Sequence, residues 1–154
     1  MQLADFLDCD AIKTALPGGN KRSVMKQLAD ISAQRIGADP QSVLAGLVER
    51  EQLGSTGFGQ GVAIPHAKID GLPQIYGLFA RLSDPVDYKA IDGRPVDLVF
   101  LLLSPPDSGA EHLKALASIS RVTRDAPTME RLRGARSRDA LAAVLMGADE
   151  RDAA

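Results

Sequence analysis

Residues 97–104 read DLVFLLLS, and this apolar run constrains the fold more than any other stretch of the 154-residue chain. A strand with one face in solvent alternates apolar and polar residues, whereas this run does not alternate, which is typical of a central strand covered on both faces. Helical patterns lie before and after the strand-rich middle of the chain. The sequence therefore predicts an α/β fold, a single domain in which helices sandwich a mixed β-sheet.

Two helices are predicted before the strands. Asn20 suits an N-cap and Gly37 a helix end, while Asp39-Pro40 begins a second helix that Gly54 ends. The apolar residues at helical spacing are Val24, Leu28 and Ile31 in the first segment and Val43, Leu44, Leu47 and Val48 in the second.

Further helices are predicted after the strands. One covers residues 110–125, and Thr128 and Ser137 are predicted N-caps of two short helices. The residues expected on the apolar face of the first are Leu113, Leu116 and Ile119. The domain is expected to span residues 1–154, with a core of about 5–147 and a polar, frayed tail at 148–154.

The middle of the chain contains the predicted strands. Residues 61–66 and 75–82 read as strands, and a short strand precedes the turn Asp92-Gly93 that leads into the central run. Residues 54–61, GSTGFGQG, are predicted to form a flexible loop with few side chains.

Composition excludes several classes of protein. The net charge is −2 and no basic block is present, so nucleic acid is a poor partner. Cys9 is the single cysteine, which fits a reducing compartment. The first residues lack the basic and then apolar order of a signal peptide, and the longest apolar run is too short to span a bilayer. We therefore expect a cytoplasmic protein without membrane insertion.

The glycine loop does not match a nucleotide site. A Walker loop needs a lysine after its last glycine, but Gly59 is followed by Gln60. A dinucleotide fingerprint follows a strand and opens a helix, and the order here is the reverse. No cofactor is expected.

His66 stands where a predicted strand ends, and strand ends in open α/β sheets are where ligand crevices form. A structural histidine is the ordinary alternative. A metal site could use His66 and His112 with Asp70, but no HExxH or CxxC spacing exists, so no metal is predicted. A serine hydrolase is also disfavoured, because the G-x-S-x-G motif is absent.

A histidine can itself be a nucleophile and carry a phosphoryl group. Such a site needs a cation and hydrogen-bond donors for the phosphate oxygens. Arg50, at the end of the helix before the glycine loop, is the candidate cation, and Ser55 and Thr56 are candidate donors. A solvated arginine and ordinary loop chemistry are the alternatives for these residues.

Two further features complete the candidate site. Gly57 and Gly59 would let a protein that brings the phosphate press against the loop. His112 opens a predicted helix, whose amide dipoles favour an anion and keep the imidazole neutral. A first-turn surface residue is the alternative for His112. Phe58, Val62 and Ile64 are expected to form an apolar rim for docking.

Residues 50–71, REQLGSTGFGQGVAIPHAKIDG, resemble the active-site segment of the mannitol/fructose-type enzyme IIA proteins of the bacterial phosphotransferase system. The lone-domain form most like this chain is the nitrogen-related enzyme IIA. The Arg-Glu pair, the Gly-Ser-Thr-Gly run, the Pro-His pair and a later histidine occur in the family's order, and the likeness covers roughly residues 5–147.

The resemblance implies a phosphotransferase component with a mixed sheet sandwiched by helices. His66 would accept phosphate through Nε2 from a small phosphocarrier protein of the HPr type, Arg50 would lie close to the phosphate, and His112 would line the same pocket. It also implies regulatory targets such as kinases or potassium transporters. A IIA component of a fructose/mannitol-type transporter that passes phosphate to a IIB domain remains an alternative, as does a non-catalytic binding domain.

Overall fold

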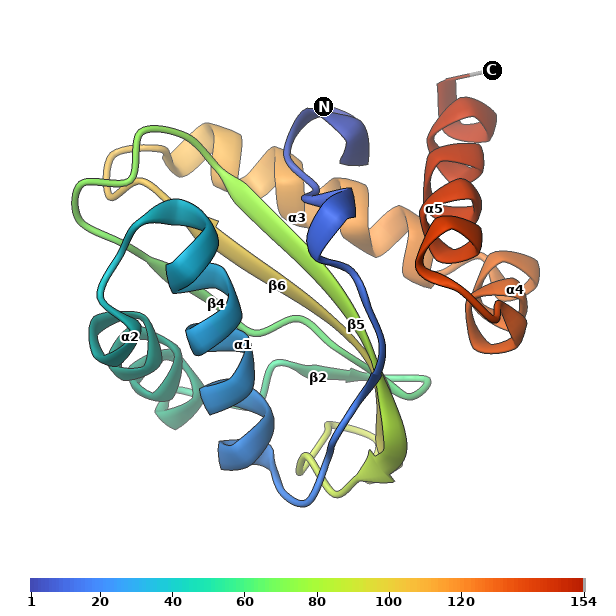
Figure 1. Cartoon of the computed structure of the whole chain (residues 1–154), viewed down its shortest axis with the longest axis horizontal. Coiled ribbons are helices and arrows are strands. Elements are labelled where there is room, and N and C mark those ends of the chain that lie inside the picture. The colour runs from blue at the N-terminus through green and yellow to red at the C-terminus, as the bar shows by residue number, and fades with distance from the viewer. Residues whose placement is uncertain (154) are drawn as a thin grey trace.

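The computed structural model describes the backbone of residues 1–153 and the side chains of residues 1–148. Figure 1 shows helices on both sides of one mixed sheet. The strands are β1 (Lys13–Leu16), β2 (Gly57–Gly59), β3 (Val62–Ala63), β4 (His66–Lys68), β5 (Tyr76–Val86) and β6 (Val96–Ser104). The helices are α1 (Lys21–Ile36), α2 (Pro40–Gln52), α3 (Gly109–Thr123), α4 (Ala126–Gly134) and α5 (Arg138–Ala153), with short 3₁₀ turns at Leu3–Asp5 and Cys9–Ala11.

The predicted sandwich is confirmed, with β6 at its centre. The sheet order is β1-β5-β6-β3-β2, and β4 also pairs with β6, beyond the end of β3. Side chains of β6 alternate between two cores: Val99, Leu101 and Leu103 pack toward α1 and α2. Leu98, Phe100 and Leu102 pack toward α3, α4 and α5. The lack of alternation in the sequence is therefore explained by apolar cover on both faces.

The first two helices begin and end where the sequence indicates. The Asn20 side chain accepts a hydrogen bond from Ser23 N, and Gly37 has the left-handed conformation (φ 72°) that suits glycine. Asp39 caps α2 ahead of Pro40, but α2 ends at Gln52, two residues before the predicted stop.

Two predictions about α3 and α4 were wrong, the buried face of α3 and Thr128 as the N-cap of α4. The buried face of α3 contains His112, Ala115 and Ile119, while Leu113 is 66% exposed, because packing on the sheet selects a face one position away from the expected one. Asp125, whose carboxylate accepts from Thr128 N, is the N-cap of α4.

The last helix is longer than expected. Ser137 caps it as predicted, accepting from Ala140 N at 3.0 Å, but the helix continues through Ala153. Ala148, placed by the sequence in a frayed tail, is buried in the second core, and the side chains of residues 149–154 lie outside the described residues.

The strands near His66 also differ from the prediction. Residues 61–66 do not form one strand, because Pro65 lacks an N–H and separates β3 from β4. The chain stays attached to β6 through the Pro65 carbonyl, which accepts from Leu102 N at 3.0 Å. The short strand expected before Asp92 is the end of β5, and β1 was not predicted at all.

The glycine loop is a hairpin and not a free loop. β2 pairs antiparallel with β3, and both turn residues, Gln60 and Gly61, have positive φ angles of 61° and 79°. Asp92 accepts from Gln60 N at 3.0 Å, and Arg133 donates to the Gln60 carbonyl at 2.8 Å. The predicted flexibility was therefore wrong, since contacts distant in sequence hold this segment in place.

Within the described residues, no helix combines the length and the apolar character needed to cross a membrane.

Candidate functional site

The candidate site lies at the edge of the sheet where β4 pairs only with β6. His66, the first residue of β4, is in register with Leu102; α2 packs against β4, and His112 of α3 contacts His66. A cavity of about 390 Å³ opens there. Its lining residues are Gly46, Glu49, Arg50, Leu53, His66, Ala67, Lys68 and His112. The structure thus brings together Arg50, His66 and His112, which are separated by 16 and 46 residues in the chain.

The backbone fixes the tautomer of His66. Its Nδ1 lies 2.9 Å from the Ile64 carbonyl oxygen, which can only accept, so Nδ1 carries the proton. Nε2 then has a free lone pair, and Arg50 Nε donates to it at 3.2 Å. Burial lowers the pKa of His66, the Ile64 carbonyl opposes this and the Arg50 charge adds to it, so the imidazole is held neutral. A neutral ring with an open Nε2 is the nucleophilic form of histidine.

Arg50 reaches His66 from the last turn of α2. One guanidinium nitrogen, Nη1, donates to the Gly54 carbonyl at 2.9 Å, while Nε contacts His66. A guanidinium has five N–H donors, so several remain for an anion in the cavity.

His112 lies in the first turns of α3 and faces His66. The ring centroids are 5.3 Å apart and the planes meet at 53°. His112 Nδ1 lies 2.6 Å from Ser104 Oγ, at the end of β6. Burial, with smaller contributions from the nearby His66 and Lys68, lowers the pKa of His112 to about 4. His112 is therefore buried and neutral, and the surface alternative for this residue does not hold.

The predicted loop residues do not line this cavity. Thr56 is buried, and its N–H and hydroxyl both donate to the Glu51 carboxylate. Ser55 Oγ accepts from Gly57 N at 3.0 Å. A side chain at Gly57 would collide with Ala90, and one at Gly59 with Asp92. The structure therefore gives these residues partners within and around the glycine hairpin.

Sequence reasoning missed four residues that matter here. Lys68 and Leu53 line the cavity, Ser104 contacts His112, and Glu51 holds the glycine hairpin. Lys68 lies two residues after His66 on the same strand, so strand periodicity could have placed both side chains on one face. No local signal connects Ser104 or Glu51 to their partners.

The expected apolar rim consists of other residues. Val62 and Ile64 are buried, and only Phe58 of the three is exposed. The exposed leucine that lines the cavity is Leu53, which is 82% exposed. Leu113, next to His112 on α3, is also exposed but does not line the cavity.

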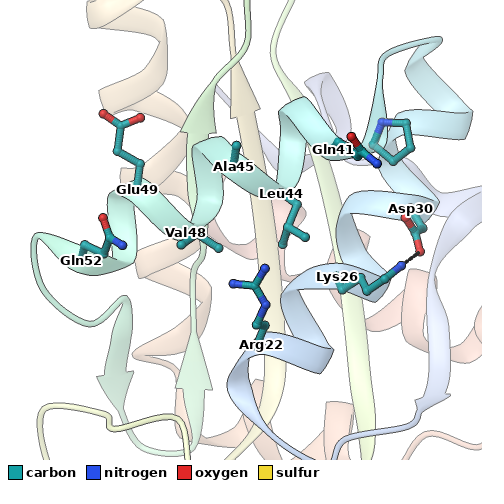
Figure 2. A pocket seen from close by; sticks show the side chains of 10 residues that line it. Arg22, Lys26, Asp30, Gln41, Leu44, Ala45, Val48, Glu49 and Gln52 are labelled. Atoms are coloured by element: carbon teal, nitrogen blue, oxygen red, sulfur yellow. Dashed lines mark hydrogen bonds and ion pairs between the residues drawn. The ribbon is translucent and has the colours of Figure 1, made fainter.

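A second, larger groove lacks this chemistry. A groove of about 740 Å³ lies between α1 and α2. Figure 2 shows Leu44, Ala45 and Val48 there, with an ion pair between Lys26 and Asp30 at 3.1 Å. The lining residues of the groove include no histidine, cysteine or hydroxyl group. Across the described side chains, no three His, Cys, Asp or Glu residues are grouped closely enough to hold a metal ion.

The fold and the site together define a class of protein: a helix-covered mixed-sheet domain with a neutral, arginine-paired histidine in an open cavity. The sequence profile of "Phosphoenolpyruvate-dependent sugar phosphotransferase system, EIIA 2" matches residues 5–147, and the chain belongs to this family. Members of the family are phosphocarriers that are phosphorylated on a histidine.

Relatives support this membership. The chain is 46% identical over 145 residues to a "Nitrogen regulatory protein" of Bradyrhizobium diazoefficiens, covering 94% of this chain and 95% of that one. It is 34% identical to a "PTS system fructose-specific EIIA component" of Haloferax volcanii, covering 84% of each. The crystal structure of the nitrogen regulatory protein IIA-Ntr from Neisseria meningitidis superposes with a TM-score of 0.88 at 33% identity, covering 93% of this chain and 98% of that one.

Proposed function

We propose that His66 Nε2 accepts a phosphoryl group from a small phosphocarrier protein of the HPr type, in a cytoplasmic relay that begins with phosphoenolpyruvate. The observation that carries the proposal is the hydrogen bond from His66 Nδ1 to the Ile64 carbonyl, which leaves Nε2 unprotonated toward the cavity. The Nε2–P bond forms as the bond between phosphorus and the donor breaks, and no proton has to leave Nε2 first.

Arg50 has two successive roles in this proposal. Before transfer it donates to Nε2, and during transfer it must turn its guanidinium to the phosphoryl oxygens. The movement is small, because the same side chain already lies at the nucleophile. Charge-assisted hydrogen bonds from a fork-shaped donor then stabilise the added negative charge.

The exposed leucines support protein docking around His66. Leu53, just after α2, lines the cavity, and Leu113 follows His112 in α3; both are exposed, so a partner docked over His66 and His112 would cover them. Two apolar side chains around a polar centre suit a surface that a carrier and a downstream partner use in turn.

The output is proposed to be regulatory. The nitrogen regulatory relatives favour a regulatory output over sugar transport, and kinases or potassium transporters are the targets that we propose. Phosphorylation adds close to two negative charges at the centre of the docking surface, so a target without a matching cation binds the unphosphorylated form better. The fructose-specific relative keeps a second candidate open, in which phosphate passes to a IIB domain.

The acceptor is tested with phosphoenolpyruvate, enzyme I and the phosphocarrier. Wild-type protein should gain one acid-labile, alkali-stable phosphate, His66→Ala should gain none, and His112→Ala should still be labelled at His66. Full labelling of His66→Ala, or phosphate found on His112 in the wild type, would refute the assignment. No labelling of the wild type would favour the non-catalytic binding domain.

The output is tested by titrating one regulatory partner with His66→Asp and His66→Ala. Weaker binding of His66→Asp alone supports the charge switch. Equal binding of both variants contradicts it, and transfer from the phosphorylated protein to a IIB domain would instead support the sugar-transport function.

A further inference from the structure

Ser104 is a buried residue whose hydroxyl contacts His112 of the candidate site. It is the last residue of β6 and is 0% exposed. Its Oγ lies 2.6 Å from His112 Nδ1, and among the described residues this is the one hydrogen bond of that hydroxyl. The contact joins the end of the central strand to the start of α3, so its geometry is set by the core and not by a surface loop.

Burial decides the direction of this hydrogen bond. A serine hydroxyl has one proton, and leaving that proton without an acceptor in a dry site costs on the order of 1–3 kcal/mol. Nδ1 is the acceptor in reach, so Ser104 donates to it. His112 is neutral, since burial lowers its pKa to about 4, and a neutral imidazole carries one N–H. The proton of His112 is therefore on Nε2.

The protonated nitrogen faces the cavity. All fully buried side-chain nitrogen and oxygen atoms of the described residues have hydrogen-bond partners. His112 Nε2 has no hydrogen-bond partner among the described residues, so it is not fully buried, and His112 lines the same cavity as His66. With Nδ1 directed at Ser104, Nε2 is the atom left to meet a group bound on His66.

The two histidines consequently have opposite tautomers. A backbone carbonyl can only accept, and it places the proton of His66 on Nδ1. A buried hydroxyl that must donate places the proton of His112 on Nε2. One ring presents a lone pair for bond formation and the other presents an N–H. If His112 had the tautomer of His66, its lone pair would repel phosphoryl oxygens.

We propose that Ser104 is a positioning residue that fixes His112 as the Nε2–H tautomer, so that His112 donates a neutral hydrogen bond to a phosphoryl oxygen on His66. The donor role rests on the proposed phosphorylation of His66, whereas the tautomer does not.

The tautomer is tested first, on full-length unphosphorylated protein with ¹⁵N-labelled histidine at pH 7.5, by two-bond ¹H–¹⁵N correlation. His112 should show a protonated Nε2 and an unprotonated Nδ1, and His66 the reverse. Ser104→Ala should shift His112 toward the Nδ1–H form, and Ser104→Thr, which keeps the hydroxyl, should restore the wild-type pattern. Ser108→Ala is the matched control, because Ser108 Oγ donates to the Pro105 carbonyl and not to a histidine.

An Nδ1–H form of His112 in the wild type would overturn the proposal. So would an unchanged tautomer in Ser104→Ala. The wild-type spectrum decides the tautomer even where the alanine variant fails to fold. The result is independent of phosphorylation, so it stands apart from the test of His66.

The donor role is tested by the rate of labelling from the phosphocarrier. Loss of one neutral hydrogen bond should slow Ser104→Ala by about three- to tenfold, with Ser104→Thr and Ser108→Ala close to wild type. An equal slowing in all three variants, or wild-type rates in Ser104→Ala, would refute it.

Discussion

Arg50 and Glu51 are neighbours in the last turn of α2, but the Arg50 side chain lies in an open cavity and the Glu51 side chain is buried. Arg50 points to the open cavity and contacts His66 and the Gly54 carbonyl. Glu51 is almost fully covered, with its side chain 6% exposed. Its carboxylate accepts from the backbone N–H and hydroxyl of Thr56, from the Tyr88 hydroxyl and from Lys21 Nζ at 2.8 Å.

The difference distinguishes side chains that stabilise the fold from side chains that are available to bind a ligand. Glu51 has its acceptor capacity used by four donors, so it can fasten the glycine hairpin but has little left for another molecule. Arg50 uses only part of its donor capacity in its hydrogen bonds to the described residues. Spare hydrogen-bonding capacity in an open cavity, and not charge alone, marks the side chain that binds an anion.

The largest expected effect is a loss of stability on replacing Glu51, the buried residue of this pair. Glu51→Ala should lower the free energy of unfolding by about 3–4 kcal/mol, because it leaves Lys21 without its partner and buried donors of Thr56 and Tyr88 unsatisfied. Urea denaturation measures this. Arg50→Ala is the control from the next position, and it should change stability by less than about 0.5 kcal/mol; equal losses in the two variants would contradict the division of roles.

A loss of stability of similar size is expected at His112, beside the cavity, when the pH falls. The folded-state pKa of His112 is about 4, below the ordinary value of 6.5, so the folded protein binds fewer protons between these values. The stability from the neutral ring is present above about pH 6.5 and is lost toward pH 4, by roughly 3 kcal/mol. The pKa of His66 is lowered in the same direction.

The measurement is the free energy of unfolding of wild type and His112→Asn between pH 4 and 7.5. Protonation of carboxylates affects both proteins, so the difference between them isolates the histidine. A difference that does not change with pH would contradict a buried, neutral His112.

Arg50 should matter for transfer more than for folding. Arg50→Ala should slow phosphorylation of His66 by about ten- to a hundredfold, which corresponds to charge-assisted hydrogen bonds of about 1.5–3 kcal/mol. Arg50→Lys should recover part of the rate, because an ammonium does not form the paired hydrogen bonds to two oxygens that a guanidinium forms. Single-turnover labelling by the phosphocarrier is the measurement, and wild-type rates in Arg50→Ala would remove its role.

The smallest expected effect concerns the edge of the cavity. Leu53 is 82% exposed, so Leu53→Ser should change stability by less than about 0.5 kcal/mol. The same change should weaken binding of the phosphocarrier by several-fold, since a docked partner would bury this side chain. Ile91→Ser is a matched control, because Ile91 is 76% exposed but does not line the cavity. Equal binding of the two variants would place the docking surface elsewhere.

Features that depend on near neighbours were predicted from the sequence. The caps at Asn20, Gly37 and Asp39 were correct because a cap involves groups within a few residues. The central strand was correct because an apolar run that long must be covered on both faces. The position of His66 near a strand boundary and of Arg50 near a helix end also followed from local pattern.

Features that depend on distant neighbours were not predicted. β1 is a strand because it pairs with β5, in register at Lys13 and Ala80. The glycine hairpin is ordered by Glu51, Asp92 and Arg133, and nothing within the hairpin itself indicates this. Gly57 and Gly59 were interpreted as room for a partner, whereas their lack of side chains makes room for the chain's own residues 90–92.

By itself, the sequence determined the first two helices, the central strand β6 with its cover on both faces and the residues able to carry a phosphoryl group, because these properties reside in local conformation and side-chain chemistry. Only the tertiary structure decided which of those residues act together. In the folded protein, His112 of α3 faces His66, and Ser104 contacts Nδ1 of His112. Arg50 points to the cavity, whereas its neighbour Glu51 is buried against the glycine hairpin. The physical reason is that a tautomer, a pKa and a spare donor are fixed by contacts, and contacts between residues far apart in the chain exist only once the sheet and helices have packed.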